Sequence, residues 1–280
     1  MSTLKEEARH FFEKLQATLI ARVESLESHA KFDENSWERP GGGGGLSRLI
    51  ENGVVFEKGG VNTSAVWGEG FFATGISVVL HPKNPFVPTV HMNLRYLERG
   101  GKAWFGGGAD LTPFYLFPED VIHFHTTLKL ACDRHHPQYY FRFKKGCDEY
   151  FYLPHRQEAR GVGGIFFDHL EEDLEKNFAF IQEVGRQFHN AYLPIVNARH
   201  GMSTTEKERR WQSIRRARYV EFNLLFDEGT AFGLKTKGRT DSILMSLPPQ
   251  AAWPGHWQPT DGSREAELMQ VLKNPREWVE

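Results

Sequence analysis

The chain of 280 residues has only two cysteines, and it has no run close to the roughly 18 apolar residues that a membrane-spanning helix needs. Cys132 and Cys147 lie in separate segments without a Cys-x-x-Cys pair, so neither a disulfide framework nor a zinc knuckle is indicated. The first 20 residues mix acids and bases and lack the apolar segment of a secretory signal. We therefore expect a cytoplasmic protein without a membrane span.

The chain also lacks an excess of charge of either sign, because its formal net charge is only −2. We therefore expect no nucleic acid or membrane partner, and an acidic ligand would be held by individually placed Arg and Lys side chains. The sequence has no Gly-x-Ser-x-Gly elbow, dinucleotide-binding glycine fingerprint or P-loop, which disfavours the common serine hydrolases, dehydrogenases and NTPases. Aromatic residues are plentiful, with 22 Phe, and suit either a broad apolar cavity or a thick core.

The pattern of elements predicts a mixed fold. Short β-rich segments between residues 53 and 97 alternate with Gly and Pro turns, which is typical of antiparallel strands. Further strands are expected over residues 164–168, 219–226 and 242–247, and helices over 4–30, 138–153, 171–192, 203–217 and 263–279, with another starting at Pro118. The sequence predicts an α+β fold with a large, mainly antiparallel β-sheet flanked by α-helices, in a single domain over residues 1–280.

A predicted hairpin of residues 75–81 and 89–96 has an unusual polar face. Its even positions are apolar, whereas its odd positions include Ser77, His81, His91, Asn93 and Arg95. Successive strand side chains point to opposite faces, so these five residues share a face if the register keeps the two apolar sets together. A solvated outer face is one interpretation. Two imidazoles, an amide and a guanidinium instead favour a site for a carboxylated ligand that uses histidine chemistry.

The histidines leave several interpretations open. His81 and His91 could ligate a metal, or one of them could act as an acid or base. His125 lies on the apolar stripe of a predicted helix, where a core role is possible, and His155 follows a helix end, where it could be a cap. The separations between these four histidines match no local zinc motif.

Two further segments are equally open. The run Gly41–Gly45 is either a flexible connector or a lid whose bare backbone approaches a ligand. The basic turn of residues 235–239 is either solvated or clamps an anion through its backbone amides and Arg239. From the residues alone, we expect a small-molecule enzyme with a basic, aromatic-rich site.

Three strings resemble the oxygen-dependent coproporphyrinogen III oxidase family. They are WFGGGADLTPFY at residues 104–115, HRQEARGVGG at 155–164 and RYVEFNL at 218–224. The glycine run, the hairpin and residues 238–246 fit the same family, in order, from about residue 35 to the C-terminus. The resemblance implies that two propionates of coproporphyrinogen III are oxidatively decarboxylated to vinyl groups, giving protoporphyrinogen IX, with O2 as co-substrate and no organic cofactor.

The resemblance also implies roles for particular residues. His91 is similar in position to the family's proton donor, and homodimers with residues 219–254 at the interface are implied. The implied substrate contacts are Ser77, Asn93, Leu94, Arg95, Lys237, Gly238 and Arg239. The histidines similar to ligands proposed for a divalent metal are His81, His91, His125 and His155.

Two positions depart from the family pattern. Glu228 follows Asp227 where the family commonly has arginine, so the role of that arginine does not carry over, although Asp227 remains a candidate site residue. Lys237 stands where the family often has glycine, and an added cation there could strengthen carboxylate binding.

Two other classes of protein compete with an oxidase. A non-catalytic tetrapyrrole carrier would keep an aromatic cavity and arginines but needs no proton donor. A metal-dependent hydrolase would keep the four histidines but does not require oxygen. Incubation of coproporphyrinogen III with and without oxygen distinguishes these alternatives.

Overall fold

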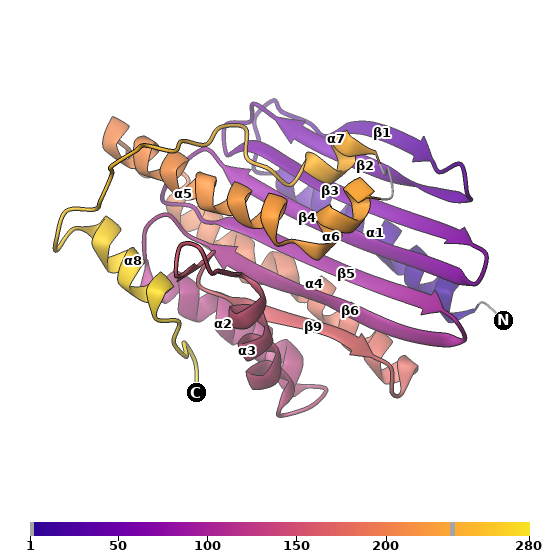
Figure 1. Cartoon of the computed structure of the whole chain (residues 1–280). Coiled ribbons are helices and arrows are strands. Elements are labelled where there is room, and N and C mark those ends of the chain that lie inside the picture. The colour runs from indigo at the N-terminus through magenta and orange to yellow at the C-terminus, as the bar shows by residue number, and fades with distance from the viewer. Residues whose placement is uncertain (1–2, 236–238) are drawn as a thin grey trace.

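The computed structural model describes residues 3–235 and 239–280, apart from the side chain of Phe232. Its centre is a seven-stranded, fully antiparallel sheet in the order β1-β2-β3-β4-β5-β6-β9 (Figure 1). The strands are β1 (Asp33–Glu38), β2 (Gly43–Glu51), β3 (Phe56–Gly68), β4 (Phe71–Pro82), β5 (Thr89–Arg99), β6 (Lys102–Thr112) and β9 (Gly164–Leu170). A separate two-stranded ribbon pairs β7 (Tyr152–Leu153) with β8 (Glu158–Ala159).

Helices cover both faces of this sheet. Figure 1 places α1 and α4 behind the sheet and α5, α6 and α7 in front of it, with α2 and α3 beside β9. The helices are α1 (Leu4–Glu24), α2 (Pro118–Asp133), α3 (Tyr139–Tyr150), α4 (Leu174–Arg199), α5 (Glu206–Leu225), α6 (Glu228–Lys235), α7 (Thr240–Leu244) and α8 (Arg264–Lys273). The predicted α+β class is confirmed. Within the described residues, no helix is long and apolar enough to cross a membrane.

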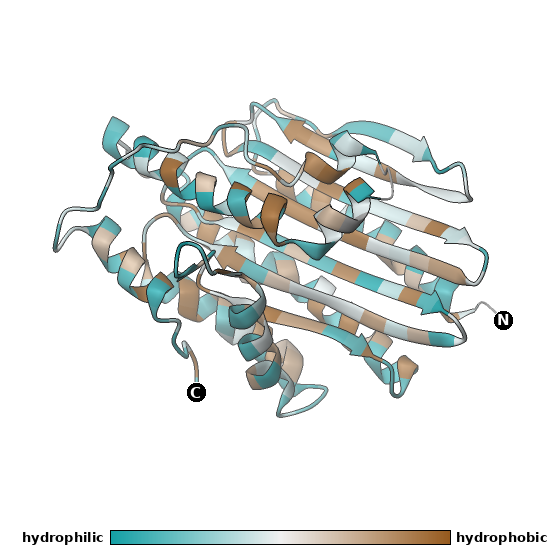
Figure 2. Ribbon diagram, in the orientation of Figure 1, coloured by the Kyte–Doolittle hydropathy of each residue, from teal (hydrophilic) through white to brown (hydrophobic). Residues whose placement is uncertain are grey.

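The hairpin β4–β5 has the predicted register. Apolar residues on the two strands lie opposite one another, and all of them are buried: Ile76 with Leu94, Val78 with Met92, and Leu80 with Val90. A Cβ added at Gly185 of α4 would lie 2.7 Å from Leu15 of α1 and 3.2 Å from Leu94, so the apolar face packs against α1 and α4. The odd positions therefore face α5–α7. Figure 2 shows hydrophobic and hydrophilic residues interleaved along the central strands, as a two-faced sheet requires.

The strand predicted over residues 219–226 is wrong, because this segment is the last part of helix α5. The helix starts with a capping box in which Thr205 and Glu208 satisfy each other's backbone N–H groups. Charged and polar residues of α5 are buried in ion pairs and hydrogen bonds, among them Arg215, Glu221 and Asn223. Its sequence consequently lacks the apolar stripe from which a helix is usually predicted.

The strand predicted over residues 242–247 is also wrong. Residues 240–244 form the short helix α7, and the apolar run ends with Met245 packed on the sheet. A Cβ at Gly60 of β3 would lie 2.2 Å from the Met245 sulfur, so the glycine makes room for this contact. Short apolar runs have the same composition in strands and in buried helical turns, and periodicity over so few residues does not distinguish them.

The glycine run is neither a flexible connector nor a lid. Gly43, Gly44 and Gly45 belong to β2, which is paired with β1 on one side and β3 on the other. Gly43 has a φ of +83°, and a Cβ there would meet the Ala65 carbonyl oxygen at 2.1 Å. At Gly45 a Cβ would lie 2.5 Å from the ring of Trp37. Glycine is needed here for close packing within a sheet.

The other predicted helices are confirmed with shifted ends. Helix α1 ends at Glu24, before the predicted limit at residue 30, and α8 ends at Lys273. Helix α4 continues to Arg199 although Pro194 lies inside it. Helix α2 starts at Pro118 as predicted, with proline in the first turn, where its missing N–H leaves no helical hydrogen bond unmade.

Candidate active site

A cavity of about 1000 Å³ lies between the polar face of the sheet and the helices in front of it. Strands β3 to β6 form its floor, and residues of α5, the start of α6 and the segment 242–246 form its roof. Aromatic side chains line much of the wall: Phe71, Phe72, Trp104, Tyr150, Phe151, Phe166 and Tyr219. This volume is at the upper end of the range of small-molecule sites, so the ligand it suits is large.

Four of the residues predicted on the hairpin face line this cavity. They are Ser77, His91, Asn93 and Arg95. Leu94, predicted from the family resemblance as a substrate contact, is fully buried on the opposite face, so only its backbone could reach a ligand in the cavity. His81 shares the polar face but is also fully buried. The functional roles assigned to these residues stay predictions.

His91 is oriented by a buried carboxylate. Asp110 lies directly opposite it on β6, and the His91 Nδ1 to Asp110 Oδ1 distance is 2.8 Å. Burial would raise the pKa of Asp110, but Arg160 and the hydrogen bond from His91 outweigh burial and hold that pKa below its ordinary value. An ionised carboxylate only accepts hydrogen bonds, so Nδ1 carries the proton. The Nε2 atom of His91 is then the nitrogen that can exchange a proton with a ligand.

Arg160 joins this pair to helix α5. Its Nη2 donates to Asp110 Oδ2 at 2.7 Å, and its Nη1 donates to the Asn223 side-chain oxygen at 2.9 Å. The guanidinium lies 4.0 Å from the ring centre of Phe151 and 4.4 Å from that of Tyr219. Both Arg160 and Asp110 are almost completely buried, so each charge depends on the other for compensation. The hydrogen-bonded series His91–Asp110–Arg160 is therefore a preorganised unit in the cavity wall.

Arg95 is the cation nearest to His91 along the same strand. Its Nη1 donates to Asn93 Oδ1 at 3.2 Å, and its Nη2 donates to Asp168 Oδ2 at 2.7 Å. The side chain is 32% exposed, so N–H groups remain accessible from the cavity. A guanidinium has five N–H donors, which allows Arg95 to bind a ligand carboxylate while it keeps both protein partners.

Asp227, kept as a candidate from the sequence, lies at the start of the roof. Its Oδ1 accepts a hydrogen bond from the Tyr150 hydroxyl at 3.1 Å, and its Oδ2 accepts from the Thr230 N–H at 2.7 Å. Tyr150 stacks on Phe166 with 4.2 Å between ring centres, and burial together with Asp227 raises the pKa of its hydroxyl. Asp227 is thus held at the cavity wall by an aromatic pair that sequence reasoning did not identify.

His81 and His125 are core histidines with both ring nitrogens occupied. His81 Nε2 donates to the Ser246 carbonyl at 2.8 Å, and its Nδ1 lies 3.2 Å from the Thr89 hydroxyl. His125 Nε2 donates to the Val162 carbonyl at 3.1 Å, and its Nδ1 lies 2.8 Å from the Tyr140 hydroxyl. Because a carbonyl only accepts, each Nε2 carries the proton and each Nδ1 accepts from the hydroxyl, which leaves no nitrogen lone pair for a metal.

Burial also keeps these two rings uncharged, because it lowers the pKa of each imidazole. It lowers the pKa of His81 to about 3, with a further contribution from the positive charge of Arg216. It also lowers the pKa of His125 to about 3. Both imidazoles are therefore neutral at physiological pH, and their contacts are those of satisfied core residues.

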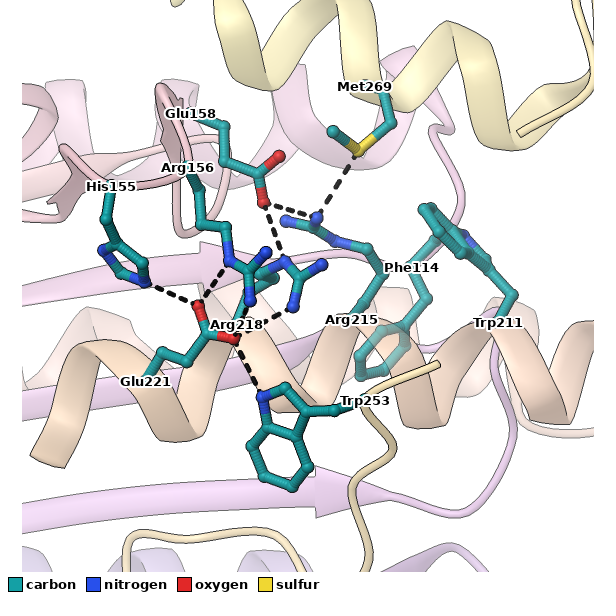
Figure 3. Close-up of polar contacts among 10 residues, drawn as sticks. All are labelled: Phe114, His155, Arg156, Glu158, Trp211, Arg215, Arg218, Glu221, Trp253 and Met269. Carbon is teal, nitrogen blue, oxygen red and sulfur yellow. Dashed lines mark hydrogen bonds and ion pairs between the residues drawn. The ribbon is translucent and has the colours of Figure 1, made fainter. Parts of the chain in front are cut away.

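His155 belongs to a cluster around Glu221, outside the cavity lining (Figure 3). Its Nε2 lies 2.8 Å from Glu221 Oε2, and Arg156, Arg218 and Trp253 also donate to the same carboxylate. Burial opposes ionisation of Glu221, but the hydrogen bonds from Arg156, His155 and Trp253 lower its pKa to about 2. The cluster fixes β8 and the preceding turn to α5.

The four histidines therefore do not form a shared metal centre, and the metal prediction is corrected on this point. Within the part of the chain that is described, no group of three or more His, Cys, Asp or Glu side chains could hold a metal ion. His81 and His125 use both nitrogens within the protein, while His91 and His155 each bond to a different carboxylate. The donor set predicted from the family resemblance does not fit a common ion.

Arg239 lies away from the cavity wall, where its Nη1 donates to the Asn35 side-chain oxygen of β1 at 2.8 Å. Lys237 and Gly238, its predicted partners in an anion clamp, lie outside the described residues. Asp110 and Arg160, like Tyr150 and Phe166, are site residues that the sequence analysis did not select. The signal for Asp110 was available, because a hairpin register that places His91 opposite residue 110 also brings Asp110 to the polar face.

Fold and cavity together define a class of protein. The chain is an α+β protein whose cavity combines aromatic walls, arginines and a histidine oriented by a carboxylate. This combination is typical of an enzyme that binds a bulky ligand with carboxylate groups. A family model described as coproporphyrinogen III oxidase matches residues 7–278. The chain therefore belongs to the coproporphyrinogen III oxidase family, as its sequence strings predicted.

Curated relatives agree with this assignment over nearly the whole chain. The chain is 48% identical to coproporphyrinogen-III oxidase 1, chloroplastic, of Arabidopsis thaliana, over 94% of this chain and 76% of the relative. It is 47% identical to the chloroplastic oxygen-dependent enzyme of Glycine max, over 96% and 79% of the two chains. It is also 47% identical to the oxygen-dependent enzyme of Parasynechococcus marenigrum, over 97% and 86%.

Proposed function

We propose that this chain, as one catalytic domain, is an oxygen-dependent coproporphyrinogen III oxidase that converts two propionates of its substrate to vinyl groups and yields protoporphyrinogen IX. The observation that carries the proposal is the cavity, in which His91, held by buried Asp110, lies on the same strand as Arg95. The reaction itself is inferred from the family to which the chain belongs.

The electron balance defines what the site must do. Each propionate loses CO2, one proton and two electrons when it becomes a vinyl group. The two electrons reduce O2, and two protons complete hydrogen peroxide. One proton comes from the propionate side chain, so one more must be delivered for each propionate that reacts. The Nε2 atom of a protonated His91 is placed to deliver a proton within the cavity, and Asp110 stabilises the imidazolium that this requires.

The remaining residues bind and orient the substrate. A macrocycle with four carboxylates needs apolar walls for its pyrroles and separate donors for its side chains. Aromatic rings supply the walls, and Arg95, Asn93 and Ser77 supply donors on one strand pair. Because these groups are fixed by sheet pairing, they offer a preorganised surface rather than one assembled on binding.

The decisive experiment incubates the purified protein with coproporphyrinogen III in air and under strict anaerobiosis. Protoporphyrin fluorescence after oxidation of the products should appear only in air. Equal product without oxygen would refute the oxidase assignment. His91→Asn should bind the substrate and lose turnover, whereas a carrier would show neither turnover in the parent protein nor an effect of the substitution.

A homodimer is part of the proposal. Large apolar side chains are exposed where α5 ends, with Leu225 63% and Trp253 54% exposed. Leu224, Phe226 and Leu234 add to the same region of the sequence, which the family resemblance places at a subunit interface. Monomers rarely expose several large apolar side chains close together, so a second copy of the chain is the occupant that we expect. The cytoplasmic location expected from the sequence stays a prediction.

A further inference from the structure

Arg95 forms an ion pair with a carboxylate of the protein itself, that of Asp168. Asp168 Oδ2 lies 2.7 Å from Arg95 Nη2, and the two side chains are equally exposed, at 32% each. Arg95 lines the cavity, whereas Asp168, on β9, is not among the lining residues. A cation intended only for a ligand carboxylate would bind it more tightly without such a neighbour. The presence of Asp168 beside a ligand-binding arginine therefore requires an explanation.

The sheet is built so that these two side chains meet. The pairing of β6 with β9 shifts register between Phe105 and Gly107, and Gly106 lies in this irregular step. A Cβ at Gly106 would lie 2.3 Å from Asp168 Oδ1 and 2.9 Å from Arg95 Nε. Both side chains thus pass over a position at which only glycine fits without displacing them.

Asp168 is also fixed from its other side. Its Oδ1 accepts the N–H of the next residue, His169, at 2.9 Å, and His169 has a φ of +52°. This left-handed backbone is uncommon for a residue other than glycine, so the turn that aims the carboxylate is a specified feature. With Asn93 on one nitrogen and Asp168 on another, the plane of the Arg95 guanidinium is held before a ligand arrives.

We propose that Asp168 is a positioning residue and permanent counter-ion that sets how tightly the cavity holds a propionate at Arg95. The inference rests on the proposed function, because it assigns Arg95 to a substrate carboxylate. Before reaction, the propionate and Asp168 share the guanidinium. After reaction the propionate has become a vinyl group and CO2, and Arg95 is left paired rather than as a half-buried unpaired charge. Asp168 thus weakens substrate binding and keeps Arg95 paired once the propionate is gone.

The charge and the shape of Asp168 have separable effects. Asp168→Asn keeps a hydrogen-bond acceptor of the same size and removes the charge, so the KM for coproporphyrinogen III should fall by about two- to fivefold, the range of a partly exposed ion pair. In the same variant kcat should stay close to that of the parent, because the vinyl group of the product has no carboxylate left to bind Arg95. Asp168→Ala also removes the positioning, so KM should rise, by roughly tenfold. A purely structural residue would not move KM in opposite directions.

Further variants control the experiment. Glu172→Gln removes an exposed carboxylate four residues further along the chain and outside the cavity lining, so it should leave KM and kcat unchanged. Gly106→Ala should push the pair apart and raise KM as Asp168→Ala does, which keeps the test available if one variant fails to fold. In an Arg95→Ala background, Asp168→Asn should no longer affect KM.

Two results would overturn the inference and are distinguishable. If Arg95→Ala raises KM but Asp168→Asn leaves KM unchanged or raises it, Asp168 is not a counter-ion that modulates binding, and the proposed function stands. If Arg95→Ala leaves KM unchanged while oxygen-dependent product still forms, Arg95 does not hold a propionate. The inference about Asp168 is then refuted, whereas the proposed function is not. Absence of oxygen-dependent product in the parent protein would refute the proposed function itself.

Discussion

Replacement of Asp110 by asparagine tests the catalytic unit most directly. The carboxylate of Asp110 accepts from His91 Nδ1 at 2.8 Å and from Arg160 Nη2 at 2.7 Å, one partner on each oxygen. An amide has a single acceptor oxygen, so in Asp110→Asn the amide N–H2 group must face either the imidazole N–H or the guanidinium. One of the two hydrogen bonds is therefore either lost or reversed in direction.

Both stability and catalysis should respond, for different reasons. Arg160 is almost completely buried and loses its neutralising charge, which should lower the free energy of unfolding by about 3–5 kcal/mol. If the amide oxygen stays on Arg160, His91 must place its proton on Nε2 and accept at Nδ1, so the ring loses the tautomer held in the parent protein. Loss of a positioned acid–base group lowers kcat/KM by about 100- to 10,000-fold.

The assay separates these effects. Urea unfolding gives the stability change, and aerobic turnover of coproporphyrinogen III is measured at a temperature where circular dichroism shows the variant to be folded. Asp148→Asn is a matched control, because Asp148 pairs with buried Lys144 outside the cavity lining. It should lose stability and keep kcat/KM. A folded Asp110→Asn variant with kcat/KM close to that of the parent would refute the assignment of His91 and Asp110 as one catalytic unit.

Three further predictions follow from other contacts. Because burial lowers the pKa of His81 and His125 from 6.5 to about 3, the unfolded chain binds two protons below pH 6.5 that the folded chain does not. Stability should thus be intact above pH 6.5 and fall by up to about 2.7 kcal/mol per pH unit below it, as measured by urea unfolding; a flat profile between pH 6.5 and 5 would contradict this. Leu225→Glu should convert a dimer to monomers in light scattering, and an unchanged mass would exclude Leu225 from the interface. Dialysis against a chelator should leave aerobic activity intact, since His81 and His125 already use both ring nitrogens in contacts within the protein; a loss restored by one divalent metal would overturn this.

The fold class and the polar face could be predicted because they depend on a period that the sequence carries. Strand alternation specified which residues of the hairpin face the core, and the register Ile76–Leu94 places them there. The same alternation misled at residues 219–226. Helix α5 buries Glu221 and Asn223 against Arg156 and Arg160, and such burial is decided by partners distant in sequence.

The candidate site was only partly predictable for the same reason. Ser77, His91, Asn93 and Arg95 lie on one strand pair, so a local pattern finds them. The metal set drew histidines from four separate elements, and nothing in the local sequence states whether a ring nitrogen meets an ion or a carbonyl. The hydrogen bonds of His125 to Val162 and Tyr140 depend on packing between α2, α3 and the loop before β9.

Counter-ions organise the cavity in a way that residue types alone do not reveal. Arg160 and Arg95 both reach the cavity, and each is paired with a carboxylate at 2.7 Å, Asp110 in one case and Asp168 in the other. The first pair is almost completely buried and is joined to His91, so under the proposed function its charge balance would support proton transfer. The second pair is one-third exposed and accessible to ligand, so its balance affects binding. A site that removes carboxylates from its own substrate needs a binding cation that remains satisfied afterwards, and we propose that Asp168 provides this at Arg95.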